Sequence, residues 1–69
     1  MARYESFETT AQRVYNYLKD NYTGAPQFVS YTEIADAIGR TRSSVSYAVG
    51  VLLRANKIAI LDGKIAVKF

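Results

Sequence analysis

The residues best suited to chemistry in this 69-residue chain lie in one stretch, GRTRSSVSYAVG, at residues 39–50. The stretch holds two arginines, a run of small hydroxyl side chains and one tyrosine. Guanidinium groups clamp phosphates or pair bidentately with a guanine edge, and hydroxyl groups bond to phosphates or bases. Such a stretch can be a polar loop, a phosphorylatable tail or the exposed start of a helix. Which of these it is determines what the chain binds.

The composition argues against catalysis. The chain has no histidine and no cysteine, which removes the usual general base, the commonest metal ligands and any disulfide. There is also no phosphate-binding loop and no carboxylate pair spaced for acid–base work. We therefore expect a protein that is not an enzyme and that needs no metal or cofactor. The absence of cysteine also favours a reducing, intracellular setting.

The N-terminus lacks the apolar segment of a secretory signal, and no apolar run is long enough to span a membrane. We therefore expect a cytoplasmic protein with no membrane partner, associated with the nucleoid if its source is prokaryotic or viral. The content of 49% hydrophobic and 22% charged residues is typical of a globular domain.

The charge distribution favours a polyanionic partner. The formal net charge is +3, and no acidic residue occurs from Gly39 to Leu61, a stretch that includes Arg54 and Lys57. Segregation of this kind is what attraction to phosphate requires. The acids occur elsewhere, at Glu5, Glu8, Asp20, Glu33, Asp36 and Asp62.

Apolar periodicity predicts a first helix over residues 7–21. Apolar residues recur there at steps of three and four, which places them on one helix face. Either Ser6 or Thr9 could provide the N-cap. The residues on the apolar face are Phe7, Ala11, Val14, Leu18 and Tyr22.

Two further helices are predicted over residues 31–38 and 42–55. Ser30 and Glu33 have the spacing of a capping box, and Gly39 is a typical helix stop. Thr41 is the expected N-cap of the second of these helices, and Asn56 tolerates a left-handed position after its end. The expected buried stripe of that helix is Val45, Ala48, Val49 and Leu52.

The C-terminal segment, KIAILDGKIAVKF, predicts a hairpin over residues 58–68. Asp62-Gly63 is a favoured two-residue turn, and closing the chain there pairs Leu61 with Lys64 and Ile60 with Ile65. The same register pairs Ala59 with Ala66 and Ile58 with Val67. It gathers four branched apolar residues on one face, which we expect to pack on the helices. That face comprises Ile58, Ile60, Ile65 and Val67. Phe28 and Val29 could add a short third strand.

In this order of elements the chain resembles the winged helix-turn-helix superfamily. YTEIADAIGRTRSSVSYAVG fits the family's twenty-residue pattern, with Ala35 where the two helices cross closely and Gly39 opening the turn. Other matching positions are Ile34, Ile38, Val45 and Ala48. The resemblance implies an α+β fold, a single domain over residues 1–69 with three helices followed by a β-hairpin wing. Arg40 departs from the pattern, because an apolar residue commonly follows the turn glycine.

The resemblance further implies that the 42–55 helix enters the major groove of double-stranded DNA. We expect a sequence-specific DNA-binding protein, a small transcriptional regulator acting as a repressor, with homodimerisation through the first helix or the wing. The alternatives are a protein–protein interaction module and a DNA-binding module for replication, partition or recombination. The candidate DNA-binding residues are Arg40, Thr41, Arg42, Ser43, Ser46, Tyr47 and Lys64.

Overall fold

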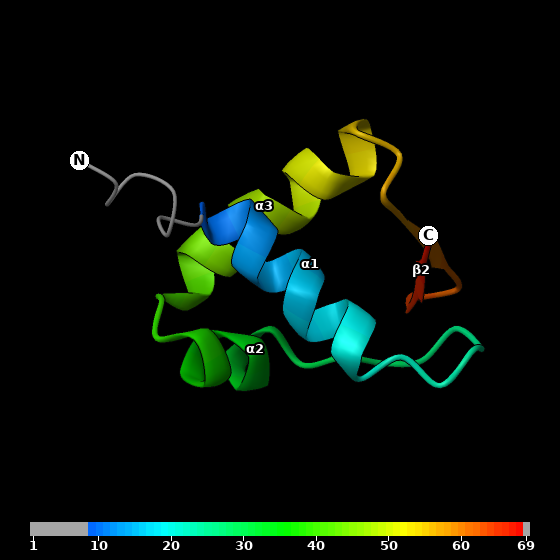
Figure 1. Ribbon diagram of the computed structural model, residues 1–69, viewed down its shortest axis with the longest axis horizontal. Helices are drawn as coiled ribbons and strands as arrows, with labels where there is room; N and C mark the ends of the chain where they lie inside the picture. Colours follow the sequence, from blue (N-terminus) through cyan, green and yellow to red (C-terminus); the bar gives the residue numbers. More distant parts are fainter. Residues whose placement is uncertain (1–8, 69) are drawn as a thin grey trace.

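A computed structural model describes residues 9–68, which form three helices followed by an antiparallel hairpin (Figure 1). The helices are α1 (Thr10–Asp20), α2 (Tyr31–Ile38) and α3 (Arg42–Arg54), and the strands are β1 (Ile58–Leu61) and β2 (Lys64–Val67). In Figure 1 the helices lie on one side and the hairpin stands at the other end. The predicted α+β class and order of elements are confirmed, and the topology is winged-helix-like.

Helix α1 begins later than the predicted residue 7. Thr9 has extended backbone angles and its hydroxyl accepts a hydrogen bond from the Gln12 N–H at 3.0 Å, so Thr9 is the N-cap. The helix ends at Asp20, with Asn21 as the C-cap, one residue before the predicted end. Ser6 and Phe7, the other predicted cap and the start of the apolar face, lie outside the described residues.

Helix α2 has the predicted bounds. Ser30 caps it, because the Ser30 hydroxyl accepts a hydrogen bond from the Glu33 N–H at 3.3 Å. Gly39 ends the helix in the left-handed region, at φ +71°, which glycine adopts without steric cost. The N–H of Arg40 then donates to the carbonyl of Ala35 at 3.0 Å, which turns the chain sharply toward α3.

Helix α3 begins after Thr41, whose hydroxyl accepts a hydrogen bond from the Ser44 N–H at 3.1 Å. The helix ends at Arg54, and Ala55, which was predicted to be its last residue, is the C-cap. Asn56 has the predicted left-handed backbone, at φ +63°. Side-chain capping and a left-handed exit therefore fix both ends of the helix that carries most candidate site residues.

The hairpin has the predicted register at all four residue pairs. Asp62 and Gly63 both have positive φ, as the two-residue turn requires. A third strand is reduced to one residue, because Gln27 exchanges two backbone hydrogen bonds with Ile65, at 3.1 and 2.8 Å. The prediction that Phe28 and Val29 would pair is therefore displaced by one residue.

The core lies between the three helices and the inner face of the hairpin. Val14 and Leu18 of α1, Ile34 of α2 and the predicted α3 stripe are buried there. Ile58, Ile65 and Val67 are also buried, but Ile60 is 42% exposed. The prediction that Ile60 packs on the helices is wrong, because Ile60 lies on the outer strand β1, whereas its buried cross-strand partner Ile65 lies between β1 and the Gln27 segment. Within residues 9–68, no helix combines the length and the apolar character that crossing a membrane requires.

Candidate nucleic-acid interface

The outer face of α3 is polar over its N-terminal half. Arg42, Ser43 and Ser46 are exposed, and Tyr47 is 71% exposed. The opposite face of the same helix is buried against α1 and α2, so the amphipathic pattern fixes which side chains reach solvent. Four of the seven candidate residues thus share one accessible surface.

Thr41 stands at the start of this surface, but its hydroxyl already serves the helix. The Thr41 hydroxyl accepts from the Ser44 N–H and donates to the Ser44 hydroxyl at 2.9 Å. Its remaining contribution to a ligand is one lone pair and its methyl group. Thr41 is therefore principally a cap that orients the residues after it.

Arg40, the departure from the family pattern, is exposed. Its backbone N–H closes the end of α2, and its guanidinium donates to the carbonyl of Gly39 at 3.2 Å. The turn is therefore held by backbone hydrogen bonds and needs no apolar anchor at this position. The guanidinium lies at the corner between α2 and α3, with most of its donors available.

A shallow hollow joins the start of α2 to the outer face of α3. It is lined by Tyr31, Arg42, Ser43 and Ser46. These side chains offer a guanidinium and three hydroxyl groups, a donor set that suits a phosphate or another oxyanion. Tyr31 was not among the candidate DNA-binding residues. Its place at the first position of α2 nevertheless suits it to a phosphate, because a helix N-terminus favours anions.

Lys64 lies apart from this surface, in the hairpin. Its ammonium group is 5.4 Å from the centroid of the Phe28 ring, within the range of a cation–π contact. Phe28 is 72% exposed and its ring also faces the turn, where a Cβ on Gly63 would lie 3.4 Å from it. The structure therefore pairs Lys64 with an aromatic neighbour that the sequence pattern did not identify.

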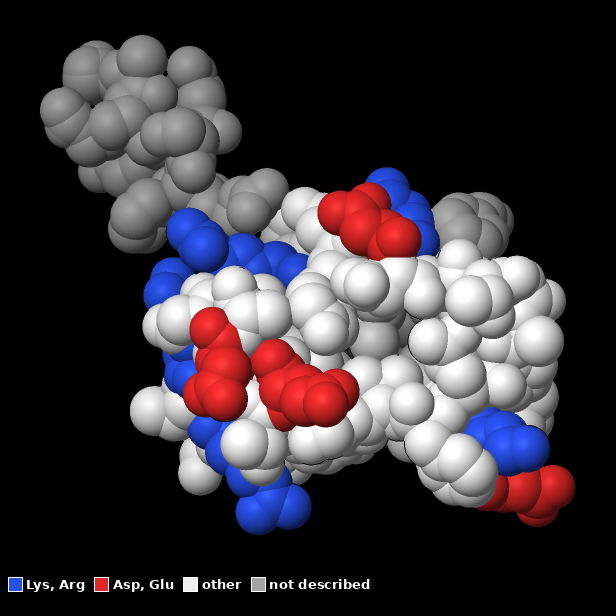
Figure 2. Space-filling view, turned by 90° about the horizontal axis from the view of Figure 1, so that it is seen from below, with Lys and Arg blue, Asp and Glu red and all other residues white. Residues whose placement is uncertain are grey.

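The surface charge is mixed rather than uniformly basic. Figure 2 shows basic side chains along one margin of the molecule, with acidic side chains directly beside them. The acids among the described residues lie outside α3, at Asp20, Glu33, Asp36 and Asp62. The acid-free surface is therefore α3 itself, while Glu33 and Asp36 on α2 limit the positive potential around it.

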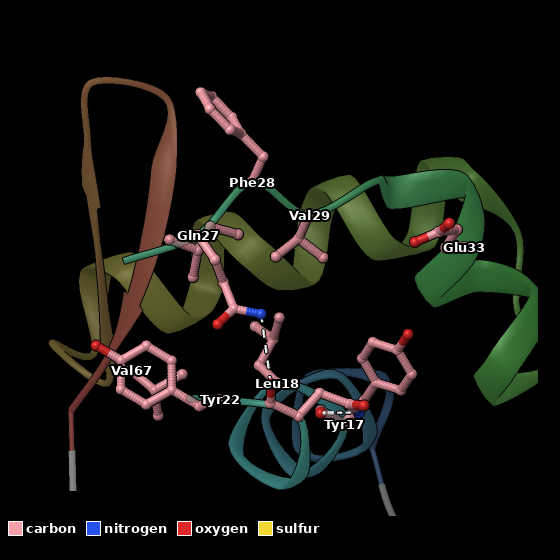
Figure 3. Close-up of a pocket in the computed structure, with 10 residues that line it drawn as sticks. Tyr17, Leu18, Tyr22, Gln27, Phe28, Val29, Glu33 and Val67 are labelled. Carbon is pink, nitrogen blue, oxygen red and sulfur yellow. Dashed lines mark hydrogen bonds between the residues drawn. The ribbon is translucent and has the colours of Figure 1, made fainter. Parts of the chain in front are cut away.

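A second hollow, of about 230 Å³, lies between the last turn of α1, residues 27–29 and the inner face of the hairpin (Figure 3). Gln27 holds this region together, since its side chain donates to the Asn21 carbonyl at 3.3 Å and accepts from the Thr23 hydroxyl at 3.0 Å. The residues that line this second hollow are mostly uncharged, and Glu33 is the one acid among them. Within residues 9–68, no three potential metal ligands of the His, Cys, Asp and Glu types gather at one place.

The likeness to winged-helix domains rests on the arrangement of the elements alone. The α2–turn–α3 corner and the following hairpin are winged-helix-like, and the capping hydrogen bonds account for that arrangement locally. A comparison of the sequence with protein-family models gives no match, and neither the curated proteins nor the solved structures contain a significantly similar chain.

Proposed function

We propose that this protein binds double-stranded DNA sequence-specifically through the N-terminal half of α3 and acts as a small transcriptional regulator. The observation that supports this most directly is the exposed, acid-free surface formed by Arg42, Ser43, Ser46 and Tyr47, with Arg40 at its corner. An α-helix fits the width of the major groove, and a helix that follows a tight turn can present its first turns to the base edges.

Each residue has a distinct role in this proposal. Arg42 forms a bidentate pair with a guanine or clamps a phosphate, and the Tyr31 hydroxyl donates to the same phosphate across the shared hollow. Ser43 and Ser46 are short, so the helix can approach the groove closely. Tyr47, which is 71% exposed, contacts a sugar, a phosphate or a thymine methyl group. As a repressor, the protein acts by occupying an operator and excluding polymerase.

The test is the affinity for duplex DNA of the Arg42→Ala variant, measured by fluorescence anisotropy on a duplex selected from a random pool. We expect a loss of about 10- to 100-fold, corresponding to about 1–3 kcal/mol for a specific arginine contact. The matched control is Arg54→Ala, which removes the same charge from the other end of the same helix. Because phosphate contacts release counterions, wild-type affinity should also fall steeply with salt. An unchanged affinity in the Arg40→Ala, Arg42→Ala double variant contradicts the proposal.

A second candidate function is a protein–protein interaction module, and the exposed Phe28 and Leu61 favour it. Exposed large apolar side chains suit contacts with proteins rather than with phosphate. This alternative predicts weak DNA binding with little salt dependence, so the same salt series separates the two functions. A DNA-binding module for replication, partition or recombination would use the same α3 surface.

A further inference from the structure

The outer edge of β1 has no strand beside it among residues 9–68. The strand β2 is paired on both sides, with β1 along one edge and the single residue Gln27 on the other. Figure 3 shows the Gln27 segment approaching the hairpin from the β2 side, with β1 on the far side. The free edge of this small sheet therefore belongs to β1.

The backbone groups of Ile60 point outward along that edge. Ile65, the cross-strand partner of Ile60, uses its own N–H and carbonyl to bond Gln27. In an antiparallel ladder this makes Ile60 and Ile65 a non-hydrogen-bonded pair, so the N–H and carbonyl of Ile60 face away from β2. One donor and one acceptor are thus available for another strand.

The side chains of β1 do nothing to block this edge. The strand reads IAIL, with no charge and no proline, although edge strands usually carry such residues to prevent pairing between chains. Ile60 is 42% exposed and Leu61 is 53% exposed, whereas Ile58 is 1% exposed. The accessible part of the edge is therefore its half near the turn, centred on Ile60.

We propose that this edge pairs with the β1 strand of a second copy of the chain, antiparallel and centred on Ile60. In that register the two Ile60 residues exchange two backbone hydrogen bonds, and Leu61 of each copy lies opposite Ala59 of the other. Because a two-fold axis relates the copies, the same surface serves both. In this dimer the two Ile60 side chains lie next to each other, and each Leu61 side chain lies next to Ala59 of the other copy. Part of the exposed surface of Ile60 and Leu61 is thereby removed from water.

Charge complementarity favours a second copy over an unrelated strand. The apolar strand is preceded by Lys57 and followed by Asp62, both exposed. Antiparallel pairing brings the Lys57 end of each copy to the Asp62 end of the other. The dimer therefore has two equivalent places where opposite charges attract each other. The interface is much smaller than the roughly 800 Å² per partner of a stable complex, so the dimer should be weak and concentration-dependent.

The test is sedimentation velocity of the full chain over a wide concentration range, in the absence of DNA. We expect a reversible monomer–dimer equilibrium, and we expect Ile60→Pro to raise its dissociation constant by at least tenfold. Proline is tolerated on an edge strand where the N–H faces solvent, and the Ile60 N–H lies outside the β1–β2 ladder. Leu53→Lys is the control, because Leu53 is a partly exposed apolar residue of α3 outside the β1 strand, and its replacement should leave the equilibrium unchanged.

A second variant, Lys57→Glu, separates loss of pairing from loss of the fold. It places like charges at both ends of the paired strands, so the dimer should weaken and should recover partly at high salt. Circular dichroism checks that each variant is folded. A wild-type chain that stays monomeric at every concentration overturns the proposal and leaves the edge to a different partner. A dimer that neither Ile60→Pro nor Lys57→Glu weakens overturns it as well. These outcomes are independent of the proposed DNA binding.

Discussion

The α2–α3 corner and the hairpin differ in whether their large apolar side chains are buried or exposed. At the corner, Ile34 and Val45 are fully buried and the outward positions of α3 are polar. In the hairpin near its turn, Ile60, Leu61 and the adjacent Phe28 are exposed. A polar, arginine-bearing surface suits a hydrated polyanion, whereas exposed apolar groups suit another apolar surface. The two regions therefore support separate proposals, a polyanion at α3 and a second copy of the chain at the hairpin.

The contrast is sharpest between two isoleucines on the same face of the hairpin. Ile60 and Ile65 are cross-strand partners, yet Ile65 is 4% exposed and Ile60 is 42% exposed. Ile65 lies on the central strand, next to the Gln27 segment, and belongs to the buried core. Ile60 lies on the free edge, where nothing in the described chain covers it. Alternation in a strand thus predicts which face a side chain is on, but the segments beside that strand decide whether the side chain is buried.

The largest expected effect is on stability and comes from truncating these two residues. Ile65→Ala should lower the free energy of unfolding by about 2–5 kcal/mol, as for a buried isoleucine, and Ile60→Ala by less than about 1 kcal/mol. Urea unfolding monitored by circular dichroism measures both, at a concentration low enough to keep the chain monomeric. If both variants lowered the free energy of unfolding equally, Ile60 would be buried within a single chain. The hairpin would then not differ from the α2–α3 corner in exposing apolar side chains.

Most of the fold could be predicted from the sequence, because its signals are local. The bounds of α2 follow from Ser30 and Gly39, and the hairpin register follows from Asp62-Gly63. Turn chemistry and capping act over a few residues, so sequence spacing is enough to locate them. The start of α1 was misplaced because two possible caps preceded the same apolar pattern, and the structure uses Thr9.

The parts that could not be predicted depend on contacts between distant segments. Gln27 pairs with Ile65, and Phe28 lies against Lys64, across slightly more than half of the chain. No local pattern specifies which residue of an irregular connection reaches a strand. The candidate surface on α3 could be predicted because helix periodicity separates its buried and exposed faces, whereas the hollow shared with Tyr31 requires the crossing of α2 and α3.

A smaller effect is expected at Gly50, which lies on the half-exposed side of α3. A Cβ there would meet only the Arg54 guanidinium, at 3.8 Å, so alanine fits without a clash. Gly50→Ala should therefore stabilise the fold by about 0.5–1 kcal/mol through helix propensity, raising the thermal midpoint. If α3 lies close to DNA at this point, the added methyl group lowers DNA affinity at the same time. A lower thermal midpoint would contradict this description of α3.

An effect as small as that at Gly50 is expected at Phe28, whose size alone would suggest a large one. Because its side chain is 72% exposed, Phe28→Ala loses mainly the contacts with Lys64 and the turn, about 0.5–1 kcal/mol. The adjacent Val29 is smaller but packs against the core, so Val29→Ala should cost more than Phe28→Ala in the same urea experiment. This order of costs follows from burial and reverses the order of side-chain volume. If Phe28→Ala proved the more costly, the aromatic ring would be supporting the hairpin from within the chain. The exposed surface near the turn would then be part of the fold rather than a surface for a partner.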